Sequence, residues 1–305
     1  MGNKLYFSLK YLLLTYLLVT VALPMAYLFG TIRGEHIKEI FSAAQFVPML
    51  KNSMVTTLVA TAISTILSFV LAWMISRTRL RLKSVFVVLF TIPMLIPSIS
   101  HGMGLVLLFG DNGLITNLLG LNIGFYGMKG IVMGSVLYSF PVAFLMFNDS
   151  FQYEDYTVYE AASILGLSKW QQFLTITLPS MRRTIISAIL AVFTMIFTDY
   201  GVPLMTGGTT MTLPVYMYRE VIGMMNFSGG AVVGFVLLLP AVAAFLMDLR
   251  NSGISTSGST VVKTYRIERN KIKEFFTYVF CNTATVALHA HYRFCVAELC
   301  ETVSD

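Results

Sequence analysis

The sequence predicts an all-α membrane protein with six transmembrane helices, and its composition is the first reason. Hydrophobic residues make up 56% of the 305 residues and charged residues only 12%, about half of the ~25% that is usual in soluble domains. The mean hydropathy is +0.74. Disordered chains are poor in apolar residues and rich in charge, so disorder is excluded as well. All three cysteines lie near the C-terminus, which excludes a disulfide framework.

The second observation is the length of the apolar stretches, since a helix needs about 20 mainly apolar residues to cross the hydrocarbon layer. Six stretches are long enough: residues 11–29, 53–75, 85–109, 131–151, 185–205 and 227–247. Helices are expected because lipid leaves no partner for unpaired backbone groups. The first stretch follows Lys4 and Lys10 as a secretory signal would, but it lacks a clean cleavage site. We therefore favour an uncleaved first helix.

The third observation is the distribution of basic residues between the loops. With the N-terminus inside, fifteen Lys and Arg residues fall in inner segments and five in outer segments. The loop at residues 77–83 alone holds four bases and no acid. The positive-inside rule then predicts that both termini lie in the cytoplasm. The net charge of +6 is therefore a topology signal, and no nucleic-acid partner is expected.

Prolines interrupt the later spans, and the bent segments 91–104 and 198–208 are candidates for lining a translocation pathway. The alternative is that membrane helices simply carry more proline than soluble ones. The candidate pathway residues are Pro97, His101, Asp199, Tyr200 and Gly201. We favour structural roles for two of them: a carboxylate of Asp199 that caps amides at a helix break, and a hydrogen-bonded His101 in a bent helix.

The longest inner loop connects the fourth and fifth spans. Residues 159–165 favour a helix that ends at Gly166, and Ser168 is a plausible N-cap of a second short helix. That second helix is expected to end near Leu178 and Pro179. The loop should therefore present two short helices, joined by a bend at glycine, to a cytoplasmic partner.

This loop carries a family resemblance. Glu160-Ala161-Ala162, then Gly166, then Ile176-Thr177-Leu178-Pro179 resembles the EAA signature of type I, MetI-like permeases of binding-protein-dependent ABC importers. The resemblance covers about residues 50–250. A looser match, which begins at residue 198, resembles permeases for ferric iron, thiamine, polyamines and 2-aminoethylphosphonate. It does not select a substrate among them.

The resemblance implies a six-helix permease fold in the bacterial inner membrane and a set of partners. These are a dimer of ATP-hydrolysing subunits, a second permease domain, and an extracytoplasmic substrate-binding protein. The residues expected to couple to the ATPase are Glu160, Ala161, Ala162, Gly166, Leu178 and Pro179. The chain would not be an enzyme and would bind no cofactor, because it lacks the Gly-x-x-x-x-Gly-Lys-Ser/Thr phosphate loop; ATP would be used by the partner.

Two other functions remain open at this point. An ion-coupled carrier or channel would need no ATPase, but such proteins usually bury several ionisable groups in the membrane, and few are present here. A membrane anchor that does not transport would leave the proline-broken spans unexplained. The Glu160–Pro179 loop separates the importer permease from both.

The C-terminal region does not fit a six-helix permease. Residues 1–250 form the predicted permease domain, residues 251–274 a polar and basic cytoplasmic linker, and residues 275–305 an anomalous tail. The tail starts like a seventh span and loses its apolar character after a few residues. One hypothesis is the start of a truncated second permease half. A metal site from His289, His291, Cys295 and Cys300 is the disfavoured alternative, because the spacing matches no standard zinc module.

Overall fold

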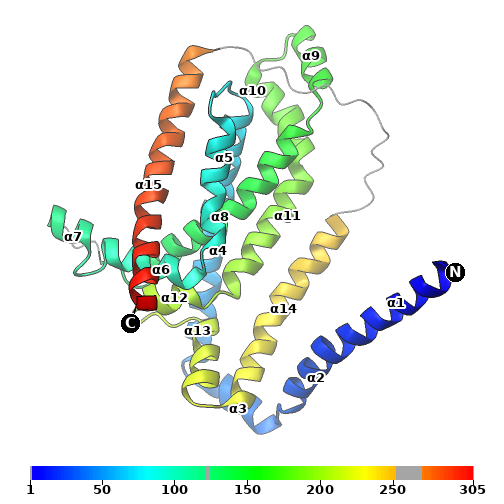
Figure 1. Cartoon of the computed structure of the whole chain (residues 1–305), viewed down its shortest axis with the longest axis vertical. Coiled ribbons are helices and arrows are strands. Elements are labelled where there is room, and N and C mark those ends of the chain that lie inside the picture. Colours follow the sequence, from blue (N-terminus) through cyan, green and yellow to red (C-terminus); the bar gives the residue numbers. More distant parts are fainter. Residues whose placement is uncertain (1, 121–123, 252–269, 305) are drawn as a thin grey trace.

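The computed structural model describes residues 2–120, 124–251 and 270–304, with side chains from residue 9 to residue 293 within these ranges. All elements in the described ranges are helices (Figure 1). The helices that form the candidate spans and the tail are α1 (Gly2–Leu17), α2 (Leu23–Gly30), α4 (Phe46–Ser76), α6 (Ser98–Phe109), α8 (Met128–Gln152), α11 (Leu178–Phe197), α14 (Phe227–Asn251) and α15 (Lys271–Ser304). The shorter ones are α3 (Gly34–Ser42), α5 (Lys83–Thr91), α7 (Leu114–Leu119), α9 (Tyr156–Ile164), α10 (Lys169–Gln172), α12 (Gly201–Thr206) and α13 (Leu213–Tyr218).

Six helical stretches of the described chain are long and apolar enough to cross a membrane. Four contain the predicted first, second, fourth and sixth spans: Leu9–Gly30, Phe46–Ser76, Met128–Gln152 and Phe227–Asn251. The other two differ from the prediction. The third span is Ser98–Leu119 and the fifth is Lys169–Phe197.

Proline explains the difference in the third span. The predicted helix 85–109 is divided into α5, a short 3-10 helix (Ile92–Leu95) and α6. Pro93 lies within the 3-10 turn, and Pro97 directly precedes α6 with an extended backbone. A proline ring disfavours helical geometry in the residue before it, so the chain turns between the two helices.

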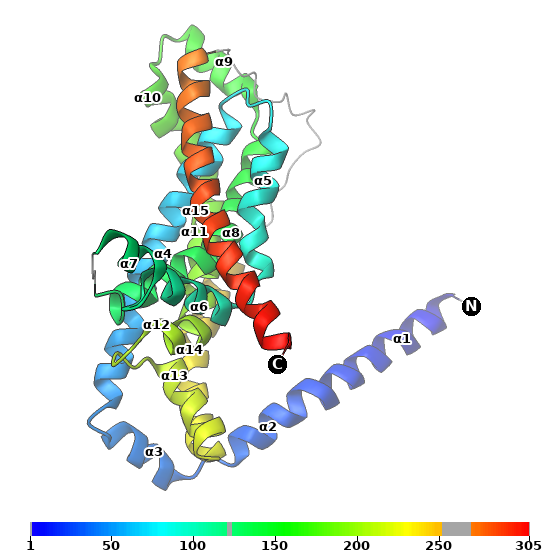
Figure 2. The ribbon, with the colours of Figure 1, turned by 60° about the vertical axis from the view of Figure 1, so that its left-hand side comes forward.

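The core lies between α4, α8 and α11, which run side by side (Figures 1 and 2). Its centre is apolar and rich in phenylalanine, with Phe90, Phe144 and Phe147 fully buried. The buried face of α4 is different between Ser53 and Ser68, where it consists of Ser, Thr and Ala: Ser53, Thr56, Thr57, Ala60, Thr61, Ser64, Thr65 and Ser68. Small side chains allow two membrane helices to approach closely.

The first span extends away from the bundle as an arm. Figures 1 and 2 show α1 and α2 leaving the end that carries α3, without a neighbouring helix along α1. None of its apolar window is buried. A π-helical turn (Leu18–Ala22) joins α1 to α2 just before Pro24.

The tail is longer and more regular than predicted. Instead of a few helical residues, α15 forms one helix of 34 residues, because the segment contains neither glycine nor proline to interrupt it. It begins beside α10 and descends along α5 to the level of α6 (Figure 2). The described chain therefore does not end on the side of α9 and α10, where the C-terminus was predicted. Most of the predicted linker lies outside the described residues.

Candidate functional site

The predicted bend of the inner loop is formed by two complementary caps. Gly166 has a left-handed backbone (φ +77°), and Leu167 N donates to Ala162 O (3.0 Å) while Gly166 N donates to Ser163 O (3.1 Å). This pair of bonds is a Schellman motif, which satisfies the last carbonyls of α9. Ser168 then forms a capping box with Gln171 at the start of α10. The structure confirms both the glycine stop and the serine cap.

The predicted end of the second helix is wrong. The chain continues from α10 through a π-helical turn (Phe173–Thr177) directly into α11, as one helical stretch from Lys169 to Phe197. Pro179 lies in the first turn of α11, directly after this π turn. The wider π turn before it, in which Leu178 N donates to Phe173 O, accommodates the proline without ending the helix.

The residues of the EAA signature do not form a single surface. Ala162 is buried against the bundle, Glu160 is partly buried, and Ala161, Gly166, Leu178 and Pro179 are exposed. The most exposed apolar side chains of the loop lie around the bend: Ile164 is 87% exposed, Leu165 78% and Trp170 67%. Apolar side chains held together on a rigid tip are typical of a protein interface.

A polar cluster fixes this loop to the end of α4. The Arg77 guanidinium forms a salt bridge with Glu154 and donates to the Tyr159 hydroxyl (3.0 Å). The guanidinium carbon also lies 4.9 Å from the centre of the Tyr159 ring, within the range of a cation–π contact. Tyr159 donates to Glu154, and its oxygen lies 2.8 Å from Thr177 Oγ1. One tyrosine therefore connects α4, α9 and the π turn.

The environment of Tyr159 keeps its hydroxyl protonated. Burial raises the pKa of Tyr159 above its ordinary value, and the hydrogen bond to Glu154 raises it further. We did not predict this cluster from the sequence, because Arg77 and Glu154 are 77 residues apart. The sequence hinted at an ion pair only through Glu154, an acid that follows the predicted span 131–151 on the same side of the membrane as the basic loop 77–83.

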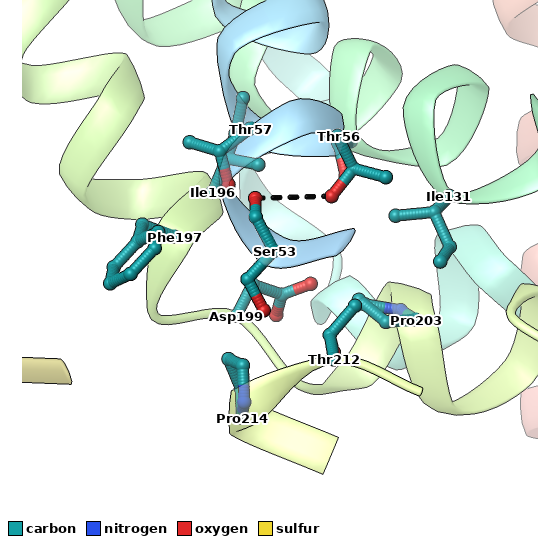
Figure 3. A pocket seen from close by; sticks show the side chains of 11 residues that line it. Ser53, Thr56, Thr57, Ile131, Ile196, Phe197, Asp199, Pro203, Thr212 and Pro214 are labelled. Carbon is teal, nitrogen blue, oxygen red and sulfur yellow. Dashed lines mark hydrogen bonds between the residues drawn. The ribbon is translucent and has the colours of Figure 1, made fainter. Parts of the chain in front are cut away.

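At the other end of the bundle, Asp199 lies at a break between α11 and α12 (Figure 3). Its carboxylate accepts hydrogen bonds from Gly201 N (3.3 Å) and Val202 N (3.0 Å), which confirms the predicted cap. Tyr200, also a candidate, is 41% exposed and stacks on Tyr218, with ring centres 4.9 Å apart. Asp199 also lines a cavity of about 10 Å³, roughly the size of one water molecule.

The walls of this cavity are mostly hydroxyl-bearing and apolar side chains from α4, α8, α11 and the segment before α13 (Figure 3). Ser53 Oγ accepts a hydrogen bond from Leu213 N (2.8 Å). The buried hydroxyls of Ser135 and Thr212 have no hydrogen-bond partner among the described residues. A buried hydroxyl without a partner costs free energy, so a polar molecule of water size suits this position.

The two bent segments predicted to line a pathway are packed directly against each other. A Cβ atom added at Gly201 would lie 2.4 Å from Ser98 Oγ and 2.6 Å from Ile99 N, and one at Gly102 would lie 2.7 Å from Met205 Cβ. Glycine is required here because the backbones of α6 and α12 approach too closely for a side chain. Pro97 is exposed, immediately before α6.

His101 is fully buried and both ring nitrogens have partners, as predicted. Nε2 lies 3.1 Å from the Pro93 carbonyl oxygen, and Nδ1 lies 2.9 Å from Nε2 of His291. A carbonyl can only accept, so His101 carries its proton on Nε2 and accepts at Nδ1 from His291. The tail helix α15 is thus hydrogen-bonded to α6. Among the described residues, no three His, Cys, Asp or Glu side chains are grouped to hold a metal ion.

These elements form two separate regions. The coupling residues Glu160–Pro179 lie in and around α9 and α10 at one end of the bundle. Asp199, Tyr200 and Gly201 lie at the start of α12, which packs on α6 toward the opposite end (Figure 1). The long helices α4, α8 and α11 connect them through the core.

Comparison with known proteins identifies the family of the chain. Residues 64–256 match the model of the family described as "binding-protein-dependent transport system inner membrane component". The ferric transport system permease protein FbpB of Actinobacillus pleuropneumoniae is 24% identical over 267 residues, which cover 85% of this chain and 39% of that protein. The chain therefore spans about two fifths of the length of this relative.

Two further similarities are shorter or structural. The molybdenum transport system permease protein ModB of Azotobacter vinelandii is 29% identical over 180 residues, 57% of this chain and 80% of that protein. A chain of a bacterial alginate ABC transporter, solved in complex with an alginate-bound periplasmic protein, has a similar fold: its TM-score is 0.68 at 17% identity, over 84% of this chain and 95% of that one.

Proposed function

Because the chain belongs to the family of inner membrane components of binding-protein-dependent transport systems, we propose that it is the permease subunit of an ABC importer and contributes one half of the translocation pathway. The ion-coupled carrier or channel is not favoured by this family membership. The match in the cytoplasmic loop and the exposed apolar tip around Gly166 support an ATP-driven mechanism.

The proposed mechanism assigns ATP hydrolysis to a separate dimer of subunits that receives the tip formed by Ile164, Leu165 and Trp170. The rigid caps at Gly166 and Ser168 present this tip without a flexible hinge. Movement of the docked ATPase would reach the membrane through the continuous helix Lys169–Phe197 and through the cluster of Arg77, Glu154 and Tyr159.

The pathway would lie where α6 and α12 meet, near Asp199 and the hydroxyl-bearing face of α4. A second permease domain, either another copy or a related half, would complete it, and an extracytoplasmic binding protein would deliver the substrate. The end with α9 and α10 would face the cytoplasm. The named relatives act on ferric iron and molybdenum, so the substrate is not assigned.

Co-purification with the ATPase subunit of the same transporter, followed by ATP hydrolysis and uptake in proteoliposomes, tests the proposal. Ile164→Asp places a charge on the apolar tip and should abolish ATPase binding without unfolding, because Ile164 is 87% exposed. Gly166→Pro and Glu160→Arg should also lose the ATPase. Glu35→Arg, an exposed charge reversal at the opposite end, is the matched control. Retained ATPase binding and uptake in all three loop variants would refute the coupling assignment.

A further inference from the structure

A large cavity lies between the inner loop and the tail helix, away from the proposed pathway. It has a volume of about 600 Å³, within the usual range of ligand pockets. Its walls come from the last two turns of α4, from α9, α10 and the π turn, and from the start of α15. Figures 1 and 2 show these elements grouped at the end with α9 and α10. The proposed mechanism gives no role to the space itself, although three of its lining residues, Arg77, Tyr159 and Trp170, belong to the coupling cluster and the tip.

One wall of the cavity is aromatic. Phe173 contacts three other rings, with centres 6.2 Å from Phe69, 5.7 Å from Trp73 and 5.4 Å from Trp170. Phe276 of α15, 63% exposed, lies on the facing side. Phe69 and Trp73 are within two turns of the end of the second span, at the depth where tryptophan is enriched at membrane surfaces. This wall suits an acyl chain.

The rest of the lining is basic and polar. Three cations, Arg77, Lys169 and Lys273, line the cavity, and no Asp or Glu is among its lining residues. The N-terminus of α15 faces the same space, with Asn270 accepting hydrogen bonds from the first amides of the helix, and this end of a helix dipole favours an anion. Two acids lie close to this lining without being part of it: Glu154 is already bonded to Arg77 and Tyr159, and Glu274 follows Lys273 in the first turn of α15.

We propose that this cavity binds an anionic phospholipid of the cytoplasmic leaflet. The phosphate would lie between Lys169 and Lys273, and the first part of an acyl chain would lie along Phe69, Trp73 and Phe276. Basic pockets between membrane helices on the cytoplasmic side bind anionic headgroups in this way. The lipid would join the start of α15 to α10.

The chain offers a built-in reporter, because both of its tryptophans, Trp73 and Trp170, line the cavity. The full chain is reconstituted in nanodiscs of phosphatidylcholine that contain a minority of either dibrominated phosphatidylglycerol or dibrominated phosphatidylcholine with the same chains. Bromine quenches tryptophan on contact. A lysine near the surface enriches an anionic lipid about fivefold. The brominated phosphatidylglycerol should therefore reach half-maximal quenching at a mole fraction at least about fivefold lower than the brominated phosphatidylcholine.

The double variant Lys169→Gln/Lys273→Gln should lose this preference. Arg79→Gln/Arg81→Gln removes the same charge from exposed positions on the same membrane face and should keep it. Equal quenching by both brominated lipids in the unmodified chain, or an equal loss of preference in the two double variants, would overturn the proposal. Thermal unfolding of each variant shows that the fold is intact.

Inorganic phosphate and glycerol 3-phosphate separate a lipid from a soluble anion. If the cavity binds lipid, neither compound should relieve quenching by the brominated anionic lipid. If either compound relieves it at millimolar concentration in the unmodified chain, and this effect disappears in Lys169→Gln/Lys273→Gln, the ligand is a soluble phosphate and the lipid assignment is wrong. These readouts require no ATPase, so they are independent of the proposed function.

Discussion

Replacing Tyr159 with Phe tests whether one side chain holds the inner loop on the bundle. The substitution removes only the hydroxyl that contacts Arg77 (3.0 Å), Thr177 (2.8 Å) and Glu154, and it keeps the ring beneath the guanidinium. A hydrogen bond to a charged group contributes about 1.5–3 kcal/mol. If the hydroxyl contributes that amount to the free energy of local opening, residues 153–179 should open about 10- to 150-fold more often in the variant, at 1.4 kcal/mol for each factor of ten.

Hydrogen exchange followed by mass spectrometry, on the chain in nanodiscs, measures this opening peptide by peptide. Amides of residues 153–179 should exchange faster by that factor, while amides in α8 and α14 should not change. Tyr153→Phe is the matched control, because Tyr153 belongs to the same loop and is 72% exposed. Unchanged exchange in Tyr159→Phe, or an equal increase throughout the chain, would refute the reasoning.

Two further predictions concern the junction of α6 and α12. Gly201→Ala should destabilise the chain by about 1–3 kcal/mol, because its Cβ would lie 2.4 Å from Ser98 Oγ; thermal unfolding in detergent measures this, and Gly34→Ala, with open space around its Cβ, should be neutral. Asp199→Ala should cost about 0.5–2 kcal/mol as a lost cap, whereas Asp199→Asn retains an acceptor for Val202 N and should preserve stability and uptake. Loss of uptake in Asp199→Asn at unchanged stability would show that the charge itself is required.

The features that the sequence predicted well are local. The apolar length of residues 53–75 and 131–151 is sufficient to identify α4 and α8, since a membrane helix satisfies its own backbone. The stop at Gly166 and the cap at Ser168 depend only on residues within one or two turns. Position 199 could be assigned as a cap because Asp followed by a glycine and a proline is a short-range signal.

The features that it did not predict depend on residues far apart or on rare backbone geometry. The salt bridge between Arg77 and Glu154 and the contact between His101 and His291 join segments that no local pattern relates. The helix continues through Pro179 by means of a π turn, which has no simple sequence signature, whereas a proline alone predicts the end of a helix. The hydroxyl face of α4 was present as a repeat of three to four residues from Ser53 to Ser68, but its burial was not apparent within an apolar span.

The π turn before Pro179 bears on the direction in which the tip of the inner loop points relative to α11. A π turn holds one residue more than an α turn, and one helical residue corresponds to a rotation of about 100° and a rise of about 1.5 Å. An α turn and a π turn both complete one turn of the helix, so deleting a single residue between Phe173 and Thr177 would convert the π turn into an α turn and leave Trp170 pointing in nearly the same direction relative to α11. The π turn thus accommodates one extra residue locally, whereas one residue added to a regular α-helix would rotate the tip by about 100° around the axis of α11.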